Sequence, residues 1–181
     1  FGALVMMQLG SDVRVAAEIC EDLWVADSPS IRHCLSGADL VVNLSASNET
    51  VSKKTYRRDL VKMQSAKCMC GYIYASSGEG ESTTDLVFTG HNLIAENGSI
   101  KAESYREKEG LLTALIDVQK LQSDRMRMNS ESETAKPDSY VRVQLRRESF
   151  GHLPDRVDAY PFVPADQEKR TERCREIMEM Q

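Results

Sequence analysis

Residues 13–25 read VRVAAEICEDLWV, and the change of character at Cys20 determines how the rest of the sequence is interpreted. Val13–Ile19 is apolar and β-branched enough to predict a buried strand. This strand is expected to end at Cys20, which the acidic pair Glu21 and Asp22 follows. A thiol at the exit of a strand is presented at the edge of a sheet, where the next backbone N–H groups face the same space. The pattern therefore makes Cys20 a candidate nucleophile.

Two observations favour a simpler role for this cysteine. Free cysteine is among the most buried residue types and often packs as a small hydrophobe. In addition, Glu21 and Asp22 place negative charge beside the thiol and disfavour its thiolate form, so a cation or general base must come from elsewhere. The histidines, His33, His91 and His152, are each predicted to be surface or turn residues and not this base.

Helix and strand patterns alternate after the cysteine. The run Ser28-Pro29-Ser30 is typical of a helix start, and the apolar run Ala38–Leu44 follows as a second strand. Lys54–Cys68 has the apolar spacing of a helix, and Tyr72–Ser76 is predicted as a third strand. This alternation predicts an α/β fold, a mixed sheet with helices packed on one face.

The second half of the sequence is expected to form hairpins and then a looser tail. Ser76–Thr84 is rich in Gly and Ser and is predicted as a loop. Further strands are expected at Leu86–Phe88, Asn92–Glu96, Ser99–Ser104 and Leu111–Val118, with Asn97-Gly98 as a hairpin turn. A short helix is expected at Gln119–Met128, extended linker at 129–164, and another helix in Ala165–Met180.

Composition excludes several classes of protein. Hydrophobic residues make up 41% and charged residues 28% of the 181, which is typical of a globular chain. The 23 basic and 28 acidic side chains give a net charge of −5, without a basic stripe for nucleic acid. No apolar run approaches the ~20 residues that cross a bilayer. The five cysteines are odd in number and irregularly spaced, which favours a reduced, cytoplasmic setting over disulfides or a zinc site.

Several stretches of the sequence resemble a single family. They are AEICEDLWV (17–25), NLSAS (43–47), the run Tyr56-Arg57-Arg58, and SGEGESTTDLVFTG (77–90) continuing through Glu96-Asn97-Gly98. Together they closely resemble the glutaminase domain of glutamine-dependent NAD synthetases, a branch of the nitrilase (carbon–nitrogen hydrolase) superfamily. The resemblance implies that residues 1–128 are the C-terminal half of such a domain. Residues 129–164 would then be a linker, and 165–181 the start of an ATP-dependent synthetase domain.

The resemblance also implies a fold and a set of site residues. The family has a four-layer αββα sandwich and a cysteine–glutamate–lysine triad, in which Cys20 matches the nucleophile that attacks the side-chain amide of glutamine. The triad's glutamate and lysine lie upstream of the nucleophile in the family, so we expect the chain to be a piece of a longer one and to be inactive alone. Glu21, Ser47 and Lys53 match positions around bound glutamine, where a carboxylate can hold the α-ammonium and a lysine the α-carboxylate. Without the resemblance, Ser47 is equally well a turn residue and Lys53 a solvated residue before a helix.

The family's complete enzyme hydrolyses glutamine and passes ammonia to ATP-activated deamido-NAD. ATP and magnesium would belong to the synthetase domain, so no cofactor or metal is expected in residues 1–181 themselves. Expected partners are glutamine, the synthetase domain of the same chain, and further copies in a homo-oligomer, but neither nucleic acid nor a membrane. Two alternatives remain open: a stand-alone nitrilase-family amidase, and a non-catalytic interaction module that keeps the fold.

Overall fold

The computed structural model describes residues 4–104, 110–128, 140–146, 163–164 and 166–180. It divides into two compact units, residues 1–147 and 148–181, and each is described by itself. Within the described part of the chain, no helix has both the length and the apolar character needed to span a membrane.

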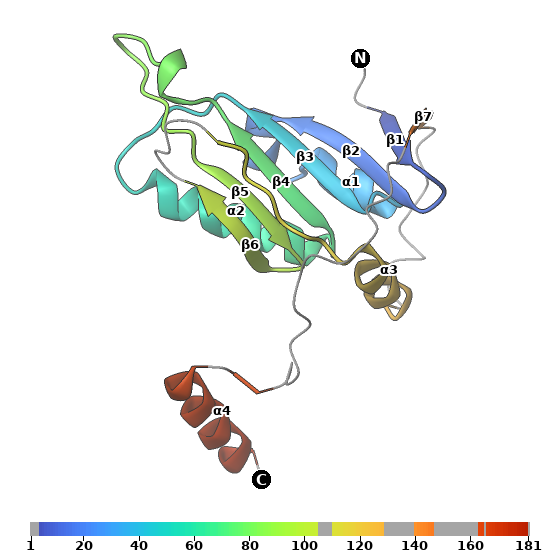
Figure 1. Ribbon diagram of the computed structural model, residues 1–181, viewed down its shortest axis with the longest axis vertical. Coiled ribbons are helices and arrows are strands. Elements are labelled where there is room, and N and C mark those ends of the chain that lie inside the picture. Colours follow the sequence, from blue (N-terminus) through green and yellow to red (C-terminus); the bar gives the residue numbers. More distant parts are fainter. Residues whose placement is uncertain (1–3, 105–109, 129–139, 147–162, 165, 181) are drawn as a thin grey trace. The chain divides into compact units, whose positions relative to one another are not determined.

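The first unit is built on a mixed sheet of seven strands in the order β6-β5-β4-β3-β2-β1-β7 (Figure 1). Neighbours β2, β3 and β4 run parallel, as do β1 and β7, and the remaining neighbours are antiparallel. The strands are β1 (Val5–Leu9), β2 (Val13–Ile19), β3 (Leu40–Ser45), β4 (Gly71–Ser76), β5 (Asn92–Glu96), β6 (Ser99–Ser104) and β7 (Val141–Leu145). The predicted mixed α/β sheet is confirmed.

Two crossover helices connect the parallel strands and cover one face of the sheet. The helices α1 (Pro29–Leu35) and α2 (Lys53–Lys67) both lie behind the sheet in Figure 1. Proline at the first helical position starts α1, as the sequence indicates. The helix predicted at Lys54–Cys68 is confirmed as α2, one residue earlier at each end. The two β–α–β units hold the ends of β2 and β3 side by side.

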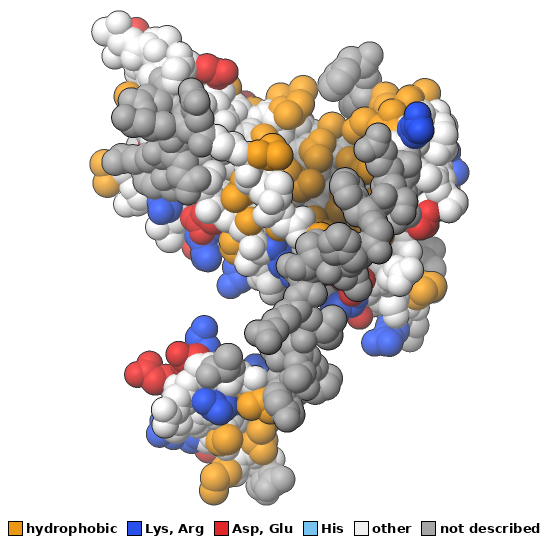
Figure 2. All heavy atoms as spheres, in the orientation of Figure 1, with side chains coloured by type: hydrophobic (Ala, Val, Ile, Leu, Met, Phe, Trp, Pro, Cys, Tyr) orange, Lys and Arg blue, Asp and Glu red, His pale blue; other side chains and the backbone are white. Residues whose placement is uncertain are grey.

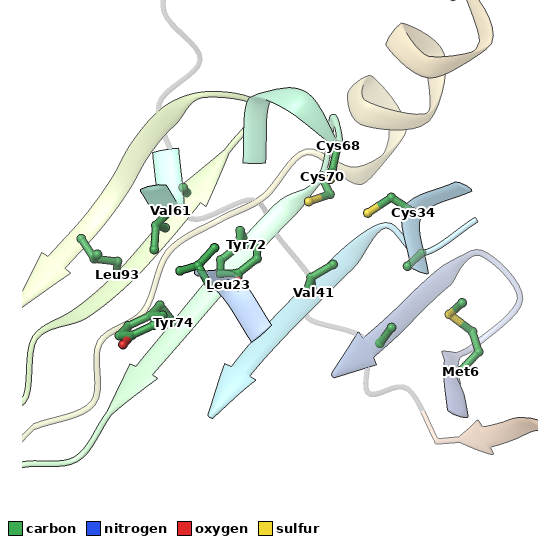
Figure 3. Packing of buried hydrophobic residues seen from close by; sticks show 13 residues of the cluster. Met6, Leu23, Cys34, Val41, Val61, Cys68, Cys70, Tyr72, Tyr74 and Leu93 are labelled. Carbon is green, nitrogen blue, oxygen red and sulfur yellow. The ribbon is translucent and has the colours of Figure 1, made fainter. Parts of the chain in front are cut away.

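The hydrophobic core lies between these helices and the sheet. Fully buried members include Val41 on β3, Val61 on α2, Tyr72 on β4 and Leu93 on β5 (Figure 3). Alternate residues of β3 face the helices, which is the period-2 pattern of a strand. Burying this face contributes most of the stabilisation, at roughly 25 cal/mol for each Å² of apolar surface.

The opposite face of the sheet keeps much of its apolar surface in contact with solvent. Ile19 and Leu44, which are register partners on β2 and β3, are 53% and 52% exposed. Val143 on β7 is 41% exposed. Figure 2 shows hydrophobic side chains gathered over this face. The described residues form a single sheet, so the four-layer sandwich remains a prediction.

The hairpin predicted at Asn97-Gly98 is confirmed, but the strand predicted at Leu86–Phe88 is wrong. Asn97 and Gly98 both have positive φ, 41° and 82°, and join β5 to β6. The backbone of residues 82–88 instead bonds within its own loop and to Glu49, whose N–H donates to the carbonyl of Val87 at 2.7 Å. These local bonds replace the pairing that a strand would need.

The strand predicted at Leu111–Val118 is also wrong. Residues 110–117 have no regular secondary structure, and α3 (Val118–Met126) follows them, which confirms the short helix predicted there. Residues 111–117 alternate between exposed and half-buried, because the segment packs against the sheet without joining its hydrogen-bond ladder. Ile116 reaches Gly71, where an added Cβ would lie 2.7 Å from its Cδ1. A strand-like alternation therefore arises here from packing alone.

Among the residues that the structure describes beyond residue 128 are a strand and a helix. The strand β7 falls inside the region predicted as an extended linker, and it pairs in parallel register with β1. In the second unit, the helix α4 (Gln167–Glu179) is capped at its N-terminus by Asp166, whose carboxylate accepts a hydrogen bond from the N–H of Lys169 at 3.0 Å. The helix predicted in Ala165–Met180 is confirmed, whereas the domain boundaries remain predictions.

Candidate active site

Cys20 lies at the point where β2 ends and a short 3-10 helix, η1 (Cys20–Leu23), begins. Its φ of 47° is in the left-handed region, which a non-glycine residue adopts at an energetic cost. Asp22 supports this sharp turn, since its carboxylate accepts a hydrogen bond from the N–H of Ile19 at 2.7 Å. Because β2 ends at Ile19, the predicted placement of Cys20 at a strand exit is confirmed, and its side chain is half-buried.

Asn43 holds the backbone of Cys20 in this conformation. The fully buried Asn43 lies on β3, and its Oδ1 accepts a hydrogen bond from the Cys20 N–H at 3.1 Å. Its Nδ2 donates to the Cys20 carbonyl at 3.4 Å and to the Tyr72 hydroxyl at 3.2 Å. One amide side chain thus binds both the donor and the acceptor of the turn residue, which offsets the cost of its positive φ.

Hydroxyl groups from the two neighbouring strands approach the sulfur. The Ser45 Oγ on β3 donates to the Cys20 Sγ at 3.5 Å, and it lies 2.5 Å from the Tyr74 hydroxyl on β4. A serine hydroxyl carries one proton, so while Ser45 donates to the sulfur, Tyr74 donates to Ser45. Burial raises the pKa of Tyr74, which keeps that donor protonated. The arrangement directs a hydrogen bond toward negative charge on the sulfur.

The predicted substrate-binding residues Ser47 and Lys53 both lie near this group. Ser47 is buried just beyond the end of β3, and its side chain helps to oppose the rise that burial causes in the pKa of Tyr74. Lys53, the first residue of α2, donates from Nζ to the carbonyl and Oδ1 of Asn48 at 2.7 and 3.0 Å. Its Nζ also lies 5.4 Å from the centre of the Trp24 ring. Burial and then the charge of Arg57 lower the pKa of Lys53, whereas Glu49 and Cys20 oppose that shift.

The third predicted substrate-binding residue, Glu21, is exposed in η1 beside the cysteine. The structure thus places Ser47 just beyond the end of β3, Lys53 beside Trp24 at the end of η1, and Glu21 within η1. The roles assigned to these residues remain predictions.

A buried carboxylate in the nucleophile motif has a structural position. Glu18 is 2% exposed and accepts hydrogen bonds from the Ser28 Oγ at 2.9 Å and the Ser30 N–H at 2.8 Å. Tyr72 also donates its hydroxyl to Glu18, and burial followed by the Glu18 charge raises the pKa of Tyr72. Glu18 therefore anchors the start of α1 to β2, where the positive end of the helix favours negative charge.

A second buried polar network lies between α2 and Tyr74 of β4. Arg57 on α2 is fully buried, and its Cζ lies 5.9 Å from the centre of the Tyr74 ring. Its Nη1 donates to Glu49 Oε2 and to His91 Nδ1, each at 3.0 Å. The His91 Nδ1 must accept from the arginine, so the ring proton is on Nε2, which donates to Glu103 at 3.0 Å. The network joins α2 to the strands next to the site.

The prediction that the histidines lie at the surface or in turns is wrong for His33 and His91. They are 2% and 0% exposed, and burial lowers the pKa of both. Each has a ring nitrogen bonded to a residue far away in the sequence, Tyr140 for His33 and Arg57 for His91. Composition and local pattern do not indicate such partners. His152 lies outside the described residues.

Sequence reasoning missed the residues that hold the cysteine, Asn43, Ser45 and Tyr74. Asn43 and Ser45 are polar residues at alternate positions of an otherwise apolar strand. This was an available signal, because a polar side chain on the buried face of a strand needs a partner. Among the described residues, no three acidic, histidine or cysteine side chains are grouped so as to hold a metal ion.

Comparison with known proteins supports the resemblance. Residues 3–126 match the family described as carbon-nitrogen hydrolase. The glutamine-dependent NAD(+) synthetase of Mycobacterium tuberculosis is 37% identical over 174 residues, which covers 91% of this chain and 26% of that protein. The human glutamine-dependent NAD(+) synthetase is 33% identical over 138 residues, covering 74% of this chain and 19% of that protein. The chain thus spans about a quarter or less of the length of these relatives.

Solved structures have a similar fold. The glutamine-dependent NAD(+) synthetase of Cytophaga hutchinsonii is 30% identical, with a TM-score of 0.51 over 61% of this chain and 17% of that chain. Saccharomyces cerevisiae Nit3, of the nitrilase superfamily, shares the fold, with a TM-score of 0.55 at 19% identity over 68% of this chain and 43% of that chain. With two thirds of its residues matched by one family model, and with Cys20 at the strand exit, the chain belongs to the carbon–nitrogen hydrolase family.

Proposed function

We propose that this chain carries the nucleophile of a glutaminase that supplies ammonia to ATP-dependent NAD synthesis. The observation that supports the proposal most is the position of the Cys20 sulfur, half-buried at a strand exit with a hydroxyl donor 3.5 Å away. The named activity of the relatives supplies the substrate, glutamine. ATP and magnesium act in the synthetase domain of the longer protein.

In this proposal Cys20 attacks the side-chain amide carbon of glutamine. A tetrahedral intermediate forms, the C–N bond breaks, and the nitrogen leaves as ammonia after it takes up a proton. A thioester between the sulfur and the glutamyl carbon remains, and water hydrolyses it to glutamate. Ser45 steadies negative charge on the sulfur before attack and when the thioester breaks. The family's upstream glutamate would supply the general base. Its upstream lysine would supply the positive charge that balances the thiolate and the tetrahedral intermediate.

The polar groups around the sulfur fit the two charged ends of a free amino acid. Lys53 lies at the N-terminus of α2, so the lysine and the positive end of the helix both favour the α-carboxylate. Ser47 adds a hydroxyl beside Tyr74, and Glu21 offers a carboxylate for the α-ammonium. A neutral amide satisfies neither charge, which favours glutamine over simple amides.

Ammonia is mostly protonated near neutral pH, and the ammonium ion has no lone pair with which to attack an adenylate. A glutaminase joined to its synthetase can pass the neutral molecule directly. A separate expectation is that the 181-residue chain alone is inactive toward glutamine, because Cys20 is the only member of the family's triad that the resemblance matches to it.

The test compares the longer protein with its Cys20→Ala variant, measuring glutamate release from glutamine. We expect the variant to lose activity, and NAD formation to persist when ammonium salt replaces glutamine. A Cys174→Ala variant is the matched control, since Cys174 is an exposed cysteine on α4. Equal glutamate release by the wild type and Cys20→Ala would refute the proposal.

A covalent probe separates binding from turnover. A diazoketone analogue of glutamine should alkylate Cys20 in the longer protein, and free glutamine should protect against it. Labelling that glutamine leaves unchanged would show a reactive thiol without a glutamine site.

A further inference from the structure

Three cysteines outside the candidate active site meet at one end of the hydrophobic core. Cys34 on α1, Cys68 at the end of α2 and Cys70 before β4 are 9%, 6% and 0% exposed (Figure 3). Met69 has a left-handed φ of 43°, and this turn buries the cysteines on both sides of it. All three side chains belong to the same buried hydrophobic cluster. The fold therefore brings two distant parts of the sequence into a cluster of thiols.

A small cavity reaches this cluster from the surface. Its volume is about 60 Å³, and its lining residues are Ile31, Cys34, Leu35, Lys67 and Cys68. Lys67 is exposed and Leu35 is 37% exposed, so the cavity has an open side. A water molecule needs roughly 10–15 Å³ by the same kind of measure. The cavity thus admits a few molecules of that size.

The surroundings of Cys68 favour its thiolate form more than those of Cys34 and Cys70 favour theirs. Hydrogen bonds from Cys34 and then Cys70 lower the pKa of Cys68, burial opposes this, and the charge of Lys67 lowers it further. Gln64 also donates from Nε2 to the Cys68 sulfur at 3.5 Å. The hydrogen bond to Cys68 raises the pKa of Cys34. The carbonyl end of α2 disfavours negative charge, and Lys67 in the last turn offsets this.

We propose that Cys68 and Cys34 form a peroxide-sensitive thiol pair, in which hydrogen peroxide enters the cavity and a disulfide between them results. The Cys68 sulfur attacks one oxygen of the peroxide, the O–O bond breaks, and hydroxide leaves and becomes water. The product is the sulfenic acid of Cys68. The Cys34 sulfur then attacks the Cys68 sulfur, the S–O bond breaks, and the departing hydroxide takes the Cys34 proton. Two thiols lose two electrons, and one peroxide becomes two waters.

The test exposes the full chain, as its Cys20→Ala variant, to hydrogen peroxide and maps the products by peptide mass spectrometry. The substitution removes the candidate nucleophile, and Cys174 remains as an exposed reference thiol. We expect a linked Cys34–Cys68 peptide that has lost two hydrogens, formed about tenfold faster than oxidation of Cys174, because thiolate character outweighs exposure. Mapping needs no substitution in the core, so a folding defect cannot obscure the result.

Two substitutions and one control substitution sharpen the result. In Cys34→Ser, a dimedone adduct should appear on Cys68, because its sulfenic acid loses the partner that resolves it. Lys67→Met should slow oxidation of Cys68, whereas Lys62→Met, an exposed residue of the same helix, should leave it unchanged. A Cys68–Cys70 link, or oxidation of Cys68 no faster than that of Cys174, would overturn the proposal.

Discussion

Replacing Asn43 tests whether one buried amide holds the candidate nucleophile in place. Two of its hydrogen bonds have good lengths, 3.1 Å from the Cys20 N–H and 3.2 Å to the Tyr72 hydroxyl. Losing two such bonds costs about 1 kcal/mol each, and a Cys20 N–H left without its acceptor costs about 1 kcal/mol more. We expect Asn43→Ala to lower the free energy of unfolding by about 3 kcal/mol.

Urea denaturation followed by tryptophan fluorescence suits this test, because Trp24 is the only tryptophan in the sequence and caps η1 next to Cys20. The matched control is Asn48→Ala, a partly exposed asparagine whose side chain accepts one hydrogen bond, from Lys53, so that its loss should cost about 1 kcal/mol. Asn43→Asp should destabilise more than Asn43→Ala, because it places a carboxylate oxygen against Glu18. Equal unfolding midpoints for Asn43→Ala and Asn48→Ala would refute the reasoning.

Three further outcomes are expected. In the longer protein, Lys53→Met should raise KM for glutamine about tenfold, which corresponds to ~1.4 kcal/mol of binding free energy. Lys62→Met is the control and should leave KM unchanged. Equal KM values for the two variants would show that Lys53 is not part of the site. Arg57→Met should lower the free energy of unfolding by about 3–5 kcal/mol, because Glu49 and His91 lose their buried partner. Arg58 is more exposed, so Arg58→Met should lower it by less than about 1 kcal/mol. Urea midpoints measure both costs, and similar costs would contradict the buried network. Burial lowers the pKa of His33 and His91 below 6.5, so the unfolded chain binds more protons and stability should fall as the pH drops below 6.5. Burial raises the pKa of Glu49 and of Glu103, but hydrogen bonds and charge from their partners together outweigh it and lower both pKa values from 4.5; the partners are Arg57 and Thr89 for Glu49, and Arg58 and His91 for Glu103. A second loss of stability should therefore follow as the pH falls below 4.5, and a flat urea midpoint across both ranges would contradict this account.

The parts of the fold that local pattern encodes could be predicted. The strand ending at Cys20, the helix α2 and the Asn97-Gly98 hairpin each carry a periodicity or a turn pair that only one local structure satisfies. Leu111–Val118 shows the limit, because its alternation is that of a strand although the segment packs on the sheet without pairing. Periodicity reports which side chains are covered, and it does not report where the backbone hydrogen bonds go.

In the candidate site, too, one part could be predicted from local sequence pattern and the other part could not. Cys20 stands out locally because a strand, a thiol and a turn coincide there. The groups that act on it, Asn43, Ser45 and Tyr74, come from two other strands, and their contact depends on the parallel register of β2, β3 and β4. That register is a property of the folded sheet, so a single sequence indicates such residues only as unexplained polar positions in apolar strands.

The pairing of β1 with β7 has a consequence for synthesis on the ribosome. β1 comes near the beginning of the described sequence, and its parallel neighbour is the last strand of the sheet to be translated. Until β7 leaves the exit tunnel, β1 has an open row of N–H and C=O groups that another nascent chain can occupy. Contacts between such distant segments also form slowly. Truncation before Val141 should therefore increase aggregation of newly made protein even though the residues around Cys20 are complete.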